Sequence, residues 1–137
     1  PHGFFNFIYL LAVIWTNDIF AYLVGMPLGK HKLSPDVSPK KSVEGSLGAI
    51  FGAILMSVNL KHLIGVGLFQ AVILGLLISV LAQSGDLIES LLKRTLKVKD
   101  SGNFMPGHGG LLDRLDSFIL TVPIFYLFTN YIIHIIR

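Results

Sequence analysis

Acidic residues occur in two closely spaced pairs, each beside a long apolar segment. Asp86 and Glu89 follow one apolar run, and Asp113 and Asp116 precede another. On a helix, a separation of three residues places two side chains on one face. Carboxylates at the end of a membrane span are costly and indicate a functional site. Packed side by side, the two pairs would supply the oxygen ligands that Mg²⁺ prefers, with water and phosphate oxygens completing the set.

Basic residues follow the first acidic pair at helical spacing. Lys93, Arg94 and Lys97 would lie largely on the same face as the acids if a helix continued out of the apolar run. Acids followed by bases in this order suit a metal site beside a phosphate site. Surface pairing of residues four apart, such as Glu89 with Lys93, explains the same spacing. The spacing alone leaves both interpretations open.

A glycine-rich segment precedes the second acidic pair. Residues 99–110 contain four glycines, Pro106 and His108. Glycine neighbours favour a loop that lies close to phosphate, where His108 would act as a hydrogen-bond donor or a general base. An oxygen-rich Mg²⁺ site disfavours a ligand role for this imidazole. The alternative is a structural hydrogen bond from His108 that holds the loop.

The segment from residue 29 to 45 is also polar and basic. Ser38 and Pro39 are typical of a helix start, with Ser38 as the N-cap and Pro39 in the first helical position. A helix N-terminus beside Lys40 and Lys41 would offer N–H groups, a positive dipole and positive charge to a phosphate. The alternative is a loop that is basic only to set membrane topology.

The composition identifies the elements that must position these residues. The chain has 137 residues, of which 53% are hydrophobic and 14% charged, whereas soluble domains carry about 25% charged residues. The absence of cysteine excludes disulfides and thiolate chemistry, and a net charge of +3 does not suggest nucleic-acid binding. Because the chain begins with Pro1, we expect it to be an internal or processed piece.

Four apolar stretches are long enough, or nearly so, to cross a membrane, which takes about 20 helical residues. They cover about residues 4–24, 46–58, 62–82 and 117–136. Lysine and arginine cluster in the first and third connections, so the positive-inside rule places both polar loops in the cytoplasm. We therefore predict an all-α integral membrane protein, a polytopic helical bundle with about four spans and two polar cytoplasmic loops.

Four residues within these spans carry further expectations. Gly48 and Gly52 are four residues apart, which favours close packing of the second span against a neighbour. Pro123 predicts a kink in the last span. Asp18 interrupts the first span, where it either faces a polar cavity or pairs with a neighbouring helix.

Several segments together resemble the signature of the phosphatidate cytidylyltransferase (CDP-diacylglycerol synthase) family. They are Ser90-Leu-Leu-Lys-Arg94, Lys99-Asp-Ser-Gly102, Pro106-Gly-His-Gly-Gly110 and Leu112-Asp-Arg-Leu-Asp116. The segment Ser38-Pro-Lys-Lys-Ser-Val-Glu-Gly45 resembles a second block of the family, and the resemblance extends from Asp18 to the last span. Met105 stands where the family more often has Leu or Ile, and the family's additional N-terminal spans are absent here.

The resemblance implies transfer of CMP from CTP to phosphatidic acid, with Mg²⁺, alone or together with a second metal ion, as the cofactor. Asp86 and Asp113 would be the main metal ligands, with Glu89 and Asp116 close by. The residues implied in catalysis are Asp86, Asp113, Lys93, Arg94, Lys99 and His108. Those implied in substrate binding are Ser38, Lys40, Lys41, Glu44, Asp100 and Arg114.

The resemblance further implies a homodimer that crosses the cell membrane (the cytoplasmic or inner membrane) several times, surrounded by lipid, with its active site facing the cytoplasm. Residues 1–137 would form the C-terminal catalytic domain. One alternative is a CTP-dependent polyprenol or phytol kinase, which would release CDP instead of pyrophosphate. A transporter that uses Asp18, Asp86 and Asp113 as a relay would leave the basic loops unexplained. A purely structural membrane subunit would not need clustered acids.

Overall fold

The fold is mostly helical, in a computed structural model that describes residues 2–96 and 111–132. The side chains of residues 3–96 and 118–131 are described among these. The helices are α1 (His2–Leu28), α2 (Val43–Asn59), the short α3 (Lys61–Ile64), α4 (Leu68–Thr95) and α5 (Leu111–Leu127), with a π-helical segment at Phe128–Ile132. A two-stranded antiparallel hairpin joins α1 to α2 and consists of β1 (Lys32–Ser34) and β2 (Ser38–Ser42).

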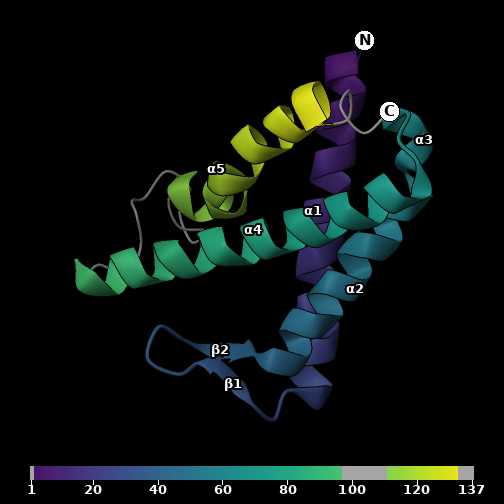
Figure 1. Cartoon of the computed structure of the whole chain (residues 1–137). Coiled ribbons are helices and arrows are strands. Elements are labelled where there is room, and N and C mark those ends of the chain that lie inside the picture. Colours follow the sequence, from purple (N-terminus) through teal and green to yellow (C-terminus); the bar gives the residue numbers. More distant parts are fainter. Residues whose placement is uncertain (1, 97–110, 133–137) are drawn as a thin grey trace.

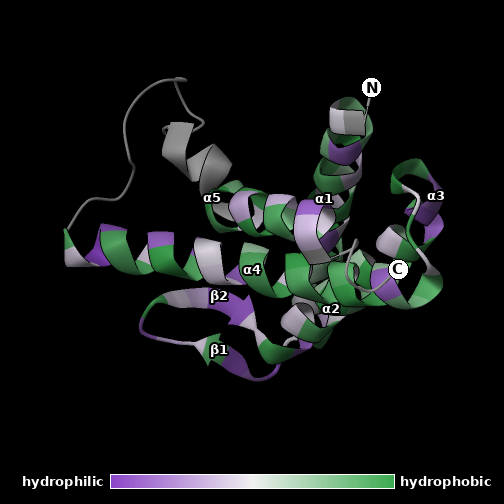
Figure 2. Cartoon of the chain, turned by 45° about the horizontal axis from the view of Figure 1, so that its top comes forward, coloured by the Kyte–Doolittle hydropathy of each residue, from purple (hydrophilic) through white to green (hydrophobic). Residues whose placement is uncertain are grey.

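Three long helices form the centre of the molecule (Figure 1). Helices α1 and α2 run in opposite directions side by side, α4 crosses them, and α5 packs on α4. The hairpin lies beneath the C-terminal half of α4 (Figure 1). Hydrophilic residues gather on this hairpin, whereas the helices are largely hydrophobic (Figure 2). The fold therefore places its most polar segment beside the polar end of its longest helix.

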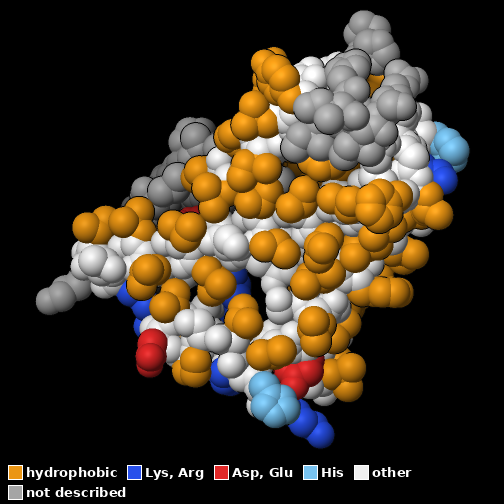
Figure 3. All heavy atoms as spheres, in the orientation of Figure 1, with side chains coloured by type: hydrophobic (Ala, Val, Ile, Leu, Met, Phe, Trp, Pro, Cys, Tyr) orange, Lys and Arg blue, Asp and Glu red, His pale blue; other side chains and the backbone are white. Residues whose placement is uncertain are grey.

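The core lies where α1, α2, α4 and α5 meet. Tyr9 and Val13 of α1 and Leu74 and Ile78 of α4 are each no more than 1% exposed, and Phe125 of α5 stacks on the ring of Tyr9. Many other large apolar side chains cover the outer surface (Figure 3). Helix α4 and the α1 segment Gly3–Leu28 are long and apolar enough to cross a membrane, by length and composition.

Small residues let the helices approach closely, as Gly48 and Gly52 predict. A Cβ atom at Gly48 would lie 2.6 Å from Val24 of α1, and one at Gly52 would lie 2.5 Å from the Phe20 ring. At Gly75 of α4, the added atom would meet the backbone of α2, 2.7 Å from the Cα of Ile54. The predicted glycine packing of α2 is confirmed, and Gly75 extends it to α4.

Replacing Gly75 by Ala is expected to destabilise the protein by about 1–3 kcal/mol, because the new methyl group meets backbone that cannot rotate away. Thermal unfolding in detergent would measure the loss. The matched control is Gly3→Ala in α1, where nothing lies within 4 Å of the new atom. Equal melting temperatures for the two variants would contradict the close approach of α4 to α2.

The predicted helix start at Ser38 and Pro39 is wrong. Residues Ser38–Ser42 form β2, and α2 begins at Val43 with Ser42 as its N-cap. The Ser42 hydroxyl accepts a hydrogen bond from the Gly45 N–H at 3.1 Å. Proline is tolerated at the edge of a sheet as well as at a helix start, so the local sequence did not distinguish the two. The first polar loop is thus partly β structure within an otherwise helical chain.

The helix that contains the third apolar stretch, α4, begins later than the predicted residue 62 and ends later than the predicted residue 82. Helix α4 starts at Leu68, after the short α3 and Gly65, whose φ of 67° favours glycine. It then continues beyond the apolar residues to Thr95, so the predicted extension that carries Asp86 and Glu89 is confirmed. Pro123 lies inside α5, and the kink predicted there stays a prediction.

Candidate functional site

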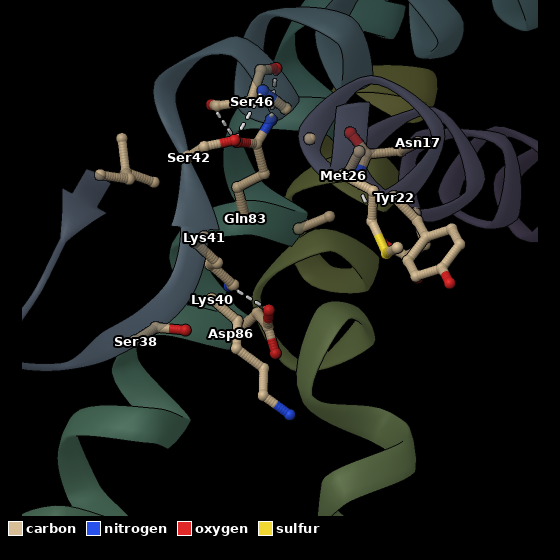
Figure 4. Close-up of a pocket in the computed structure, with 16 residues that line it drawn as sticks. Asn17, Tyr22, Met26, Ser38, Lys40, Lys41, Ser42, Ser46, Gln83 and Asp86 are labelled. Carbon is tan, nitrogen blue, oxygen red and sulfur yellow. Dashed lines mark hydrogen bonds and ion pairs between the residues drawn. The ribbon is translucent and has the colours of Figure 1, made fainter. Parts of the chain in front are cut away.

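A cavity of about 560 Å³ opens between α1, the hairpin, α2 and α4. Figure 4 shows side chains from all four elements around it. Its wall combines apolar residues, among them Ala21 and Met26 of α1, with polar groups from all four elements. The polar and charged residues of the lining are Asn17, Asp18, Ser38, Lys40, Lys41, Ser42, Ser46, Gln83 and Asp86.

An ion pair joins the hairpin to α4 inside this cavity. The Nζ atom of Lys41 contacts the Oδ2 atom of Asp86 (Figure 4). The two side chains are 27% and 36% exposed, so both remain open to the cavity. An ammonium and a carboxylate at one place can bind a phosphate and a cation together, which is the chemistry expected of a phosphoryl-transfer site.

The end of α4 carries two further contacts. The Nζ atom of Lys93 lies 3.0 Å from Oε1 of Glu89, which is 7% exposed. The Nε atom of Arg94 donates a hydrogen bond to the Val37 carbonyl in the hairpin turn at 2.6 Å. The pairing of residues four apart therefore occurs, as one of the two interpretations of this spacing anticipated. Arg94 ties the tip of the hairpin to α4.

A chain of hydrogen bonds runs along one side of the cavity and links α2, α4 and α1. The Ser46 hydroxyl donates to Oε1 of Gln83, and Nε2 of Gln83 donates to the Ser79 hydroxyl at 2.9 Å. Ser79 in turn donates to Oδ1 of Asn17 at 2.5 Å, and Asn17 donates to Oδ1 of Asp18 at 3.2 Å. We call these residues, Ser46, Gln83, Ser79, Asn17 and Asp18, the polar chain.

Glu44 fixes the base of the hairpin. Its Oε2 atom accepts hydrogen bonds from the backbone N–H groups of Lys30 and His31 at 3.2 and 3.3 Å, and Oε1 lies 2.6 Å from Nδ1 of His31. The hydrogen bond with the His31 ring is the main cause that lowers the pKa of Glu44 from 4.5 to about 2. Glu44 thus holds the hairpin that carries Lys41.

The Glu44 carboxyl is expected to titrate near pH 2, so its hydrogen bonds to the hairpin stabilise the fold less in strong acid. Because the pKa is lowered on folding, the stabilising contribution is complete above about pH 4.5 and is lost as the pH falls towards 2. Carboxyl ¹³C chemical shifts of Glu44 would measure this midpoint. In a His31→Ala variant the midpoint should rise towards 4.5, and an unchanged midpoint would contradict the role given to the imidazole.

The structure brings some of the predicted site residues together and separates others. Ser38, Lys40, Lys41 and Asp86 line the cavity. Glu89, Lys93 and Arg94 lie further along α4, and Glu44 lies at the hairpin base. The predicted residues Lys99, Asp100 and His108 fall outside the described residues, as do the side chains of Asp113, Arg114 and Asp116.

Four polar cavity residues have no place in the sequence-based site: Asn17, Ser42, Ser46 and Gln83. Polar side chains inside otherwise apolar helices were the available signal, because such groups are buried only with partners. For Asp18 the sequence allows two interpretations, a side chain that faces a polar cavity or one that pairs with a neighbouring helix. The structure places Asp18 in the cavity lining. Its neighbour Asn17, 2% exposed, connects it to the rest of the polar chain.

Comparison with known proteins gives consistent matches along the chain. The model of the cytidylyltransferase family matches residues 1–132. The phosphatidate cytidylyltransferase of Bacillus subtilis (strain 168) is 45% identical over 127 residues, which are 91% of this chain and 47% of that protein. Those of Staphylococcus aureus (strain COL) and Synechocystis sp. are 40% and 45% identical over 124 and 135 residues. These matches cover 89% and 93% of the chain and 48% and 44% of the relatives, so the chain spans about half their length.

Proposed function

Because this chain belongs to the cytidylyltransferase family, we propose that the protein transfers CMP from CTP to phosphatidic acid, giving CDP-diacylglycerol and pyrophosphate for phospholipid synthesis. The observation that carries the proposal is the ion pair of Lys41 and Asp86 in a cavity open between the hairpin and α4. The names of the relatives support the same reaction.

The cavity suits two anionic substrates that must lie side by side. Lys40 and Lys41 supply positive charge from the hairpin, and Ser38 and Ser42 supply hydroxyl groups. On α1 the wall includes Tyr22 and Met26, which are 64% and 70% exposed. The polar groups would bind the phosphates of CTP and phosphatidic acid, and the exposed apolar wall would face the acyl chains.

The reaction needs positioning more than proton transfer. The phosphate oxygen of phosphatidic acid is already largely ionised near neutral pH, so it can attack without a protein base. It would attack the α-phosphorus of CTP in line, forming the new P–O bond. The bond between the α-phosphorus and the bridging oxygen breaks, and pyrophosphate leaves with the electron pair. Lysine ammonium groups near the phosphates would stabilise the charge that develops on the leaving group.

A divalent cation fits the donor chemistry of the cavity. Asp86 and Asp18 both line it and offer carboxylate oxygens. Among the described side chains, no cluster of three His, Cys, Asp or Glu residues is placed to hold a metal ion. Asp86 would therefore hold Mg²⁺ together with water, substrate phosphates and, as the sequence predicts, Asp113, with Glu89 and Asp116 nearby. When bound, Mg²⁺ would neutralise the charge of the nucleotide phosphates.

The wider arrangement is part of the same proposal. Helices α1 and α4 would cross the membrane, and the shorter apolar helices α2 and α5 would complete four spans. The hairpin and the end of α4 would face the cytoplasm, where CTP is available. Lys93, Arg94, Lys99, Asp100, His108 and Arg114 would shape the phosphate and nucleotide contacts. Two copies of the protein would associate as a homodimer.

The test is an assay of the full-length gene product in detergent with labelled CTP, phosphatidic acid and Mg²⁺. The expected result is pyrophosphate and a lipid-linked CMP in equal amounts, with both lost on addition of a chelator. Release of CDP with a phosphorylated lipid alcohol would instead identify a lipid kinase. A folded protein that forms neither product would overturn the proposal.

A further inference from the structure

We propose that Asp18 is a positioning residue that keeps the Lys41 ammonium group in the cavity, and that Asn17 fixes the position of the Asp18 carboxylate. The inference rests on the proposed function, in which Lys41 binds substrate phosphate. It adds a second acidic neighbour for that lysine, on a different helix from Asp86.

The position of Lys41 depends on groups outside its own strand. Its long side chain extends from β2, a strand of a two-stranded hairpin, and such a chain has many rotamers. Asp86 contacts its ammonium group from α4. Asp18 of α1 lines the same cavity as Lys41 and Asp86. Lys41 therefore shares the cavity with one acid on α4 and another on α1.

The second acid matters because, in the proposed reaction, Asp86 would both pair with Lys41 and bind Mg²⁺. A carboxylate that binds a cation attracts an ammonium group less strongly, since its charge is shared. If Asp86 were the only acid near Lys41, cation binding would release the lysine from its place. Asp18 would keep Lys41 in the cavity at that stage, beside the phosphates that it has to bind.

Asn17 makes Asp18 a fixed group and not a mobile one. Asn17 is 2% exposed and Ser79 is fully buried, so their polar atoms depend on each other for hydrogen bonds. Ser79 donates to Oδ1 of Asn17, which leaves the Asn17 amide N–H to point at Asp18. Through Ser79 and Gln83, the polar chain sets this arrangement relative to α4 and α2.

A second buried polar contact provides a control within the same helices. The Tyr9 hydroxyl of α1 contacts the Ser57 hydroxyl of α2, which donates to the Ala71 carbonyl of α4 at 2.5 Å. Tyr9 and Ser57 are fully buried and do not belong to the cavity lining. Tyr9→Phe thus weakens a link between α1 and α2 without touching the polar chain.

The test is a set of double-mutant comparisons in the full-length protein, with kcat and the KM for CTP measured separately. Asp18→Asn should lower kcat roughly tenfold, and Asn17→Ala should lower it by a similar or smaller factor. Adding Asp18→Asn to the Lys41→Met variant should lower kcat no further. Adding Asn17→Ala to the Asp18→Asn variant should likewise lower kcat no further. Tyr9→Phe should lower the melting temperature and leave kcat unchanged in each background.

The outcomes separate the inference from the proposed function. The inference would be overturned if the double variant Asp18→Asn with Lys41→Met lost kcat by the product of the two single losses. Asp18 would then act independently of Lys41. The inference would also be overturned if Tyr9→Phe lowered kcat as much as Asn17→Ala does. Asn17 would then act only through the packing of the helices. Absence of turnover in the unmutated protein would instead remove the proposed function on which the inference rests.

Discussion

Replacing Asp86 by Asn is expected to lower turnover on the order of a thousandfold while the protein remains folded. The substitution keeps the size of the side chain and removes its charge. It therefore removes both the partner of Lys41 and the carboxylate proposed to hold Mg²⁺. Labelled CMP transfer to phosphatidic acid would measure turnover, and thermal unfolding in the same detergent would measure stability.

The fold is expected to survive because the ion pair is partly exposed. Asp86 is 36% exposed and Lys41 27%, and pairs open to solvent contribute at most about 1 kcal/mol. The matched control is Asp36→Asn, since Asp36 is exposed in the hairpin and lies outside the cavity lining. It should change turnover less than twofold. Near-normal activity of Asp86→Asn would exclude Asp86 from the proposed site.

The second large effect is expected for Lys41→Met, which keeps much of the apolar stem and removes the ammonium group. We expect kcat/KM for CTP to fall about a hundredfold, because the charge that is proposed to contact phosphate in the reaction is lost. Steady-state kinetics over a range of CTP concentrations would measure this. Lys32→Met is the matched control, as Lys32 lies on the other strand of the same hairpin and outside the cavity lining.

A charge exchange separates a chemical role of Lys41 from a structural one. The double variant Lys41→Asp with Asp86→Lys restores an ion pair between β2 and α4 but moves the positive charge to the helix. If the pair only fastened the hairpin, this exchange would recover activity. We expect it to remain as inactive as Asp86→Asn, because the phosphate and the cation would each meet a charge of the wrong sign.

Local patterns in the sequence determined several features that the structure bears out. The run of apolar residues followed by acids and bases predicted a helix that continues beyond its apolar part, and α4 extends to Thr95. The spacing of Gly48 and Gly52 predicted close packing of α2, which the short distances to α1 confirm. These properties depend on spacing along one element, so the sequence carries them directly. The family resemblance agrees with the family match along the chain.

The tertiary structure decided which polar residues meet. Lys41 and Asp86 are 45 residues apart in the chain (86 minus 41), and only the packing of the hairpin against α4 brings them into contact. Likewise, Asn17 and Ser79 are partners because α1 and α4 cross at that level. Ser38 and Pro39 suited a helix start as well as a strand edge, and pairing with β1 selected the strand. Contacts between distant segments depend on how whole elements pack, which spacing along a single element does not encode.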